Sequence, residues 1–233
     1  MKLNDEKDMW ENALSTGTYF DCGYNYAEDL IRRRMDKSIT DLTLGAIGAK
    51  SGGPEAPFIP CFFDVEKEGK DWSMLEIGCG YGLFASHFCF FVKEYIGIDV
   101  SKYIVEKGNM ALREANIPNA RLLQVDNCNL DNLQDNYFDL IFTAAVFIHT
   151  PLEVTRRYLE LTYSKLKKGG RFLHHFNMCS TESGIHNCGS HTHMYTEKEL
   201  DGIFSGTELK IQGVLNNSQF SPSKWMRYVY GVK

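Results

Sequence analysis

One stretch decides the fold of this chain: Leu75-Glu76-Ile77-Gly78-Cys79-Gly80-Tyr81-Gly82. The apolar run over residues 74–77 predicts a strand that enters this stretch, and the spacing over residues 83–93 predicts a helix that leaves it. Glycines at alternate positions let the backbone turn sharply and lie close to a ligand. Because a plain strand-to-helix turn does not need three of them, the stretch predicts a ligand-binding turn.

Outward from this turn, short apolar runs alternate with longer amphipathic segments. Such alternation is typical of an α/β fold, in which helices cover both faces of a parallel sheet. The expected strands cover residues 74–77, 95–98, 122–125, 138–142, 171–176, 209–215 and 225–232. The expected helices cover residues 83–93, 103–115, 151–166 and 197–204, and Lys168-Gly169-Gly170 predicts a turn.

The charge and composition argue against several classes of protein. The net charge of -5 repels phosphate backbones, so we expect no nucleic-acid partner. The seven cysteines follow no regular framework, which is typical of reduced thiols in a cytoplasmic protein. Residues 1–8 are charged where a signal peptide would be apolar, and the longest apolar run, residues 88–92, is too short to cross a bilayer. We therefore expect a cytoplasmic protein with no membrane partner.

The glycine spacing differs from the dinucleotide-binding fingerprint, because Leu83 stands where that fingerprint has its third glycine. Glu76 followed by alternate glycines instead resembles motif I of the class I S-adenosylmethionine-dependent methyltransferases, of the small-molecule type. The resemblance continues in register over about residues 73–204. It implies S-adenosyl-L-methionine as the cofactor. It also implies a Rossmann-like, doubly wound, mostly parallel seven-stranded sheet with an antiparallel C-terminal strand and an N-terminal helical cap.

The length of the chain suits one domain. We expect a single methyltransferase domain over residues 1–233, because a chain of 233 residues can bury one sizeable α/β core. A stretch rich in glycine and proline, residues 51–60, separates an N-terminal helical part from the main fold. Residues 1–70 are therefore expected to form a helical cap that binds the substrate, and residues 71–233 the cofactor-binding core.

The resemblance also implies a cofactor site. Asp99, at the end of the second predicted strand, matches the acidic residue that binds the ribose in this family, and Asp126 matches the one that contacts the adenine amino group. Glu76 lies where a carboxylate helps to hold the methionine ammonium, directly or through water. Asn127 either supports Asp126 or caps a helix. The expected cofactor-binding residues are Glu76, Gly78, Cys79, Gly80, Gly82, Asp99, Val100, Asp126, Asn127, Phe142 and Thr143.

Histidine residues indicate where the methyl acceptor is expected to bind. Five of the seven fall within residues 174–193, and His149 follows the fourth predicted strand. Both regions should open at the carboxyl edge of the sheet, where ligands bind in such folds. A hydroxyl acceptor needs a base and neutral imidazole titrates in the useful range, although a structural or pocket-lining role also explains each histidine. The candidate catalytic residues are His149, His175 and His193.

An aromatic cluster near the N-terminus contains Tyr19, Tyr24 and Tyr26. It either packs the cap onto the sheet or closes over the sulfonium of the cofactor, because aromatic faces attract cations. These three tyrosines and His191 are the candidate substrate-binding residues.

The segment His186-x-Cys188-x-x-His191-x-His193 raises the question of a metal. Its residue types suit zinc, but the spacing matches no standard site. The glycine and serine within it are typical of a flexible loop. We therefore expect no metal.

The expected class of methyl acceptor is indicated by a sequence motif that the chain lacks. After the fourth predicted strand it reads Thr143-Ala144-Ala145-Val146, without the Asn/Asp-Pro-Pro-Tyr/Phe of the methyltransferases that act on nucleic-acid bases. We expect an enzyme that transfers a methyl group to oxygen or nitrogen of a small molecule, such as a sugar, a phosphorylated metabolite or a specialised metabolite. It is expected to act as a monomer or homodimer. The alternatives are a protein methyltransferase and a non-catalytic cofactor-binding or scaffold subunit.

Overall fold

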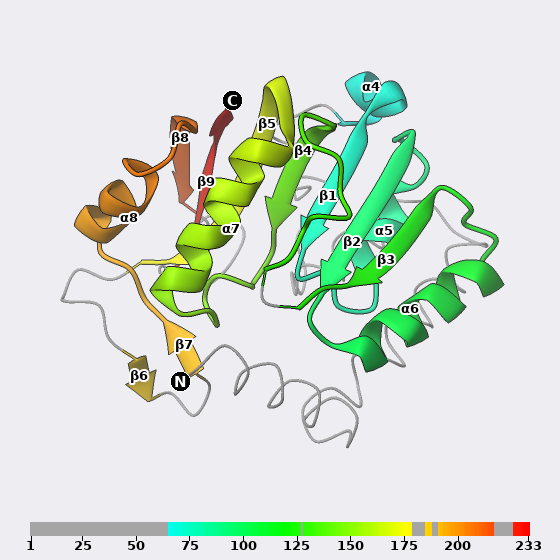
Figure 1. Ribbon diagram of the computed structural model, residues 1–233, viewed down its shortest axis with the longest axis horizontal. Helices are drawn as coiled ribbons and strands as arrows, with labels where there is room; N and C mark the ends of the chain where they lie inside the picture. The colour runs from blue at the N-terminus through cyan, green and yellow to red at the C-terminus, as the bar shows by residue number, and fades with distance from the viewer. Residues whose placement is uncertain (1–64, 127, 179–184, 188–190, 217–225) are drawn as a thin grey trace. The chain divides into compact units, whose positions relative to one another are not determined.

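The computed structural model describes residues 65–126, 128–178, 185–187, 191–216 and 226–233 (Figure 1). The chain divides into two compact units, residues 1–127 and residues 128–233. The predicted cap over residues 1–70 lies almost wholly outside the described residues. Among the helices that the structure describes, none combines the length and the apolar character that crossing a bilayer requires.

The first unit contains a parallel sheet with the strand order β3-β2-β1. Every residue of β1 is buried, as expected of a parallel strand that is covered on both faces. Helices α5 and α6 pack against β2 and β3. The elements are α4 (Val65–Glu68), η1 (Gly69–Asp71), β1 (Ser73–Ile77), α5 (Leu83–Phe88), β2 (Glu94–Asp99), α6 (Lys102–Glu114) and β3 (Ala120–Gln124).

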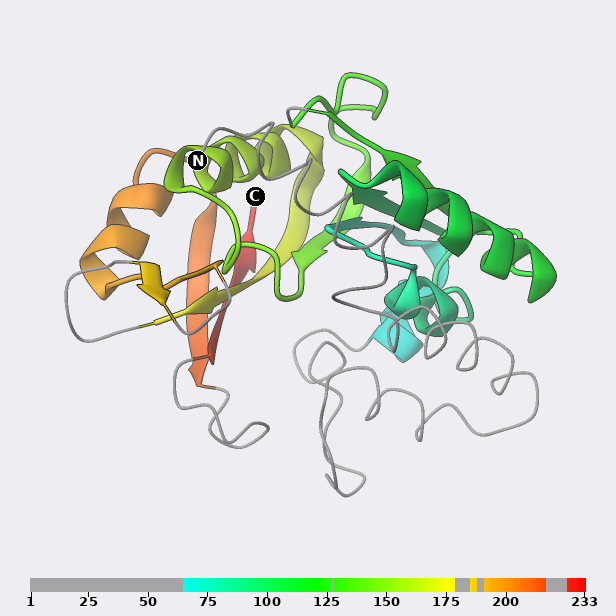
Figure 2. The same ribbon diagram turned by 90° about the horizontal axis from the view of Figure 1, so that it is seen from below.

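The second unit contains four strands in the order β4-β5-β9-β8. Strand β4 runs parallel to β5, whereas β9 runs antiparallel to both β5 and β8. Helix α7 lies along β5 and contacts α8, as Figures 1 and 2 show. The elements are β4 (Phe138–Thr143), α7 (Leu152–Lys165), β5 (Leu166–Asn177), β6 (Ile185–Asn187), β7 (His191–His193), α8 (Glu197–Phe204), β8 (Lys210–Asn216) and β9 (Met226–Val232).

The predicted strands and helices from residue 73 onward are all present in the described part of the chain. Three strands of the first unit and four of the second account for the seven expected, and the C-terminal strand β9 is antiparallel to both its neighbours. The mostly parallel α/β prediction is therefore confirmed. Helix α8 covers the predicted residues 197–204, and a capping box between Thr196 and Glu199 fixes its start.

Three local expectations were wrong. Helix α5 ends at Phe88 instead of residue 93, because the side-chain amide of Asn119 donates to the carbonyls of Cys89 and Val92 at the helix end. The predicted turn at residues 168–170 lies within β5, where Gly169 has a positive φ of 78° and the register with β4 shifts. The segment over residues 186–193, expected as a loop, contributes the short antiparallel strands β6 and β7.

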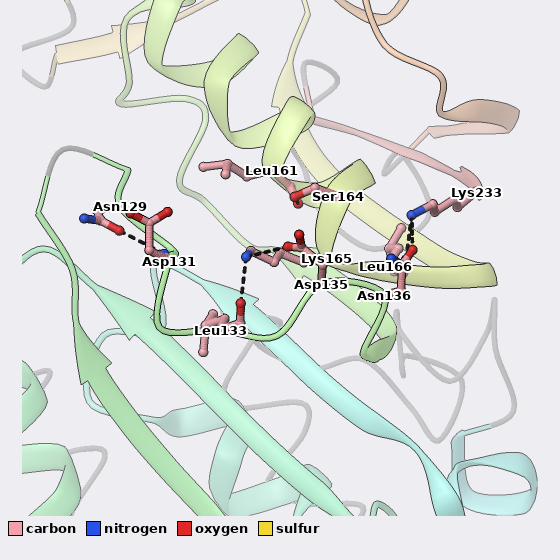
Figure 3. A network of polar contacts seen from close by, with 10 residues as sticks. All are labelled: Asn129, Asp131, Leu133, Asp135, Asn136, Leu161, Ser164, Lys165, Leu166 and Lys233. Carbon is pink, nitrogen blue, oxygen red and sulfur yellow. Dashed lines mark hydrogen bonds and ion pairs between the residues drawn. The ribbon is translucent and has the colours of Figure 1, made fainter.

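Lys165 and Lys233 of the second unit hold the chain that leads into β4, where Lys233 Nζ donates to Asn136 Oδ1 at 2.6 Å (Figure 3). Lys165, at the end of α7, donates from Nζ to the Leu133 carbonyl and to Asp135 Oδ1, each at 2.7 Å. The Lys165 side chain is 8% exposed, whereas that of Asp135 is 63% exposed. The buried contact with the carbonyl therefore matters more to stability than the ion pair, because solvent screens an exposed pair.

We predict that Lys165→Met lowers the free energy of unfolding by about 1–3 kcal/mol, because it leaves the Leu133 carbonyl without a hydrogen-bond donor. The control Asp135→Ala should lower it by less than about 1 kcal/mol, because the carboxylate is largely exposed. Urea unfolding of the two variants measures both. Equal losses would mean that the ion pair, and not the buried carbonyl contact, dominates.

Candidate functional site

The glycine turn between β1 and α5 has a backbone that other residues rarely adopt. Gly78, Gly80 and Gly82 have positive φ angles of 72°, 53° and 81°. A Cβ at Gly82 would lie 3.1 Å from Leu122 Cδ1, which is a tight contact, and the positive φ makes any other residue strained there. A Cβ at Gly80 would meet no atom of the described residues within 4 Å. Gly80 therefore exposes its backbone to open space, where a ligand can approach closely.

The end of β2 supplies the hydrogen-bond acceptors for this turn. The backbone N–H groups of Gly78 and Cys79 both donate to the Ile98 carbonyl, at 2.8 and 3.0 Å. The Gly80 N–H donates to Asp99 Oδ2 at 3.0 Å. Three consecutive backbone donors are thus satisfied by two neighbouring residues of β2, which fixes the turn beside the carboxyl end of that strand.

The Asp99 carboxylate connects the turn to the start of α6. Its Oδ1 accepts from the Ser101 N–H at 3.0 Å, and Ser101 is the N-cap of α6. A carboxylate can accept about four hydrogen bonds, and it can accept from two neighbouring hydroxyl groups at once. Asp99 is half-buried at the strand end, next to half-buried Val100. Its chemistry therefore suits a ligand with paired hydroxyl groups.

Asp126 lies just beyond β3 in the same unit. The N–H of its neighbour Val125 donates to the Asp99 carbonyl at 2.9 Å, which ties the ends of β2 and β3 together. The Asp126 side chain is exposed. The first unit thus brings together the glycine turn, Asp99 and Asp126. Asn127 lies outside the described residues.

Glu76 lies deeper than the sequence suggested. It is 2% exposed, and its carboxyl accepts a hydrogen bond from the hydroxyl of Tyr95 on β2. Burial raises the pKa of Glu76 to about 8, the Tyr95 hydrogen bond opposes this rise, and the nearby Asp99 adds to it. Tyr95 was not among the predicted residues, although a tyrosine in a buried strand needs a partner for its hydroxyl.

Cys79 contributes a protonated thiol to the turn. Burial, and then the nearby carboxylates of Asp99 and Glu76, raise the pKa of the Cys79 thiol well above its usual range. The thiol donates to the Gly80 carbonyl, with a sulfur–oxygen distance of 3.5 Å. Cys79 is therefore an unreactive packing residue at neutral pH.

In the second unit, His175 on β5 lies at the end of β4. Its backbone N–H donates to Thr143 Oγ1 at 3.2 Å, and its ring Nδ1 accepts from the Ala145 N–H at 3.0 Å. The imidazole stacks on Tyr228 of β9 with 4.9 Å between ring centroids. Burial, and secondarily the nearby His149, lower the pKa of His175 to about 4. The imidazole is therefore neutral at physiological pH.

The loop between β4 and α7 carries His149 and is held by backbone contacts. The His149 N–H donates to the Val146 carbonyl at 2.8 Å. The Ile148 carbonyl accepts from the His193 N–H of β7 at 2.6 Å, and the Phe147 carbonyl accepts from the Tyr195 hydroxyl at 2.9 Å. The three candidate catalytic histidines thus lie on or beside this loop. Tyr195 is a linking residue that sequence reasoning missed.

The other predicted site residues lie in different parts of the chain. Phe142 and Thr143 are fully buried at the end of β4, where the Thr143 hydroxyl is already engaged by His175. His191 is the first residue of β7. The predicted residues Tyr19, Tyr24 and Tyr26 lie outside the described part of the chain. The absence of a metal at residues 186–193 stays a prediction, because Cys188 also lies outside it.

We predict that the free energy of unfolding falls as pH rises from about 6.5 to 8. The unfolded Glu76 is already ionised there, whereas the folded carboxyl keeps its proton until about pH 8, so ionisation favours the unfolded chain. The slope from this single group is at most about 1.4 kcal/mol per pH unit. Glu76→Gln should remove it, as measured by urea unfolding. The control Glu106→Gln, at an exposed position of α6, should keep it, and an unchanged slope in Glu76→Gln would contradict the assignment.

Comparison with known proteins agrees with this geometry. A family model described as a methyltransferase domain matches residues 75–174, which include the glycine turn, Asp99 and β4. An uncharacterised methyltransferase of Schizosaccharomyces pombe is 37% identical over 78 residues, a stretch that covers 32% of this chain and 27% of that relative. This chain therefore spans about a quarter of that relative's length.

Two solved structures are similar over most of the chain. A SAM-dependent methyltransferase from Methanosarcina mazei has a TM-score of 0.60 at 17% identity and covers 76% of this chain and 97% of its own. Geranyl diphosphate C-methyltransferase from Streptomyces coelicolor, solved with Mg²⁺, geranyl diphosphate and S-adenosyl-L-homocysteine, has a TM-score of 0.60 at 14% identity and covers 89% and 97%. These likenesses confirm the Rossmann-like fold. Within that fold, residues 75–174 are similar to a methyltransferase domain.

Proposed function

We propose that this protein is an S-adenosylmethionine-dependent methyltransferase that methylates oxygen or nitrogen of a small molecule. The observation that carries the proposal is Gly80, whose open backbone lies beside the Asp99 carboxylate at the end of β2. A turn that is open on one side and anchored to a carboxylate on the other suits a ligand that has both a polar chain and a ribose. The matched methyltransferase domain supports this reading.

The cofactor is assigned to the first unit. Asp99 would accept hydrogen bonds from the two ribose hydroxyls, and Asp126 from the adenine amino group. The glycine turn would take the methionine part, since its backbone can approach a ligand closely at Gly80. When bound, S-adenosylmethionine supplies a methyl group that its sulfonium has already activated. The remaining task of the protein is to position the acceptor and to move its proton.

The acceptor is assigned to the second unit, where the histidines lie. A hydroxyl group becomes a better nucleophile as a base removes its proton, and His149, His175 and His193 are the candidate bases. The negative net charge supports a small acceptor over a nucleic acid. The bound geranyl diphosphate of the similar Streptomyces coelicolor enzyme likewise supports a small-molecule acceptor.

We expect S-adenosylhomocysteine to bind the protein and to raise its melting temperature. A ligand that binds only the folded state adds about 2.7 kcal/mol of stability at a hundred times its Kd. Differential scanning fluorimetry and titration calorimetry measure the two effects, with NADH as the comparison ligand. Binding of NADH without binding of S-adenosylhomocysteine would contradict the proposed function.

We further expect Asp99→Ala to weaken S-adenosylhomocysteine binding by about 2 kcal/mol, because hydrogen bonds to a charged group contribute about 1.5–3 kcal/mol each. The control Glu106→Ala removes an exposed carboxylate of α6 and should leave the affinity unchanged. Calorimetry on both variants, with circular dichroism to confirm folding, measures the difference. Wild-type affinity in a folded Asp99→Ala protein would remove Asp99 from the site.

A further inference from the structure

The imidazole of His175 is held in one tautomer. Its Nδ1 accepts the Ala145 N–H at 3.0 Å, and a ring nitrogen that accepts a hydrogen bond carries no proton. The proton of the neutral ring must therefore be on Nε2. That nitrogen is buried and has no hydrogen-bond partner in the described part of the chain. The ring therefore has an acceptor on the side of Ala145 and an N–H on the other side.

This tautomer makes His175 a poor base. A base needs a lone pair that faces the proton it removes, whereas Nε2 already carries its proton and Nδ1 is engaged by Ala145. Burial, and then the neighbouring His149, also lower the pKa of His175 to about 4, so a second proton is disfavoured at neutral pH. The geometry of His175 is therefore unsuited to the task of a base.

The same ring nitrogen holds a strained part of the loop. Ala145 has a positive φ of 58°, in the left-handed region that residues other than glycine seldom adopt. Such a conformation costs about 1–3 kcal/mol and persists only where the surroundings enforce it. The bond from the Ala145 N–H to His175 enforces it directly, four residues before His149 in the same loop.

The loop has further attachments after Ala145. The Tyr195 hydroxyl donates a hydrogen bond to the Phe147 carbonyl, and the His193 N–H donates one to the Ile148 carbonyl. These contacts hold the later part of the loop, whereas His175 holds its beginning. The proximity of His149 to His175, which lowers the His175 pKa, means that a movement of this loop would change the surroundings of His149.

We propose that His175 is a positioning residue: by accepting the Ala145 N–H it fixes the loop over residues 144–149 and so holds His149 as the base of the reaction. The base role rests on the proposed function. In that step His149 takes the proton of an acceptor hydroxyl while the oxygen–methyl bond forms and the methyl–sulfur bond breaks, leaving S-adenosylhomocysteine. The hold on the loop does not depend on this chemistry and can be tested alone.

Two substitutions separate the roles of the two ring nitrogens. In His175→Asn the side-chain oxygen lies near the position of Nδ1 and can still accept from Ala145. In His175→Gln the amide reaches toward Nε2, and no acceptor atom remains at the position of Nδ1. We expect the Ala145 amide to exchange with solvent at least about tenfold faster in His175→Gln and within about threefold of wild type in His175→Asn.

The titration of the His149 ring, followed by ¹⁵N NMR between pH 5 and 8, reports the position of the loop. His175 is neutral over this range, so loss of its charge cannot move the His149 midpoint. We expect the midpoint to stay within about 0.2 pH units of wild type in His175→Asn and to move by at least about 0.5 units in His175→Gln. If the Ala145 amide exchanges faster while the His149 midpoint does not move, the hydrogen bond from Ala145 to His175 only stabilises the loop and does not position His149. That result would overturn the proposal. Equal effects of the two substitutions would also overturn it.

A measurement on the wild-type protein does not depend on how the variants fold. Long-range ¹H–¹⁵N spectra should show a proton on His175 Nε2 and none on Nδ1, unchanged from pH 5 to 8. The opposite tautomer, or a titration within that range, would overturn the proposal. Calorimetry with S-adenosylhomocysteine tests the methyltransferase assignment separately, so a failure of that assignment leaves the result on the loop intact.

Discussion

The backbone N–H groups of a strand-to-helix turn need acceptors, and in this protein the last two residues of β2 supply them. Ile98 accepts two of these hydrogen bonds and Asp99 the third. Such an arrangement requires the turn to lie directly against β2. It does so at Gly97, where even a Cβ would lie only 2.6 Å from the Cβ of Cys79. The position of the candidate cofactor site therefore depends on the absence of one side chain from the neighbouring strand.

The second unit uses a similar solution. There a polar side chain on β5, His175, accepts from the Ala145 N–H near the start of the loop after β4, and the Tyr195 hydroxyl donates to the Phe147 carbonyl further along. In both units, loops that follow parallel strands are held by side chains from other strands or segments. Residues such as Asp99 and His175 therefore have a structural task as well as a proposed functional one. A loss of activity on their substitution has to be separated from a displaced loop.

The sequence predicted these features to different extents. Glycines with positive φ and an acidic residue at a strand end are local signals, so the turn and the position of Asp99 could be predicted. Tyr95 and Tyr195 could not, because their partners Glu76 and Phe147 are distant in the sequence. Helix α5 was predicted too long for the same reason. Its end depends on the side chain of Asn119, which precedes β3 and is distant from α5 in the sequence. Strands β6 and β7 are too short to show an alternating pattern.

The order of strands in the second unit has a consequence for synthesis on the ribosome. Strand β9 follows β8 in the chain, yet it lies between β5 and β8. During translation β5 and β8 emerge before the strand that joins them. Until then the facing edges of β5 and β8 lack this partner, and exposed strand edges are sites where chains aggregate. The four-stranded sheet can therefore close only after β9 has emerged behind β8.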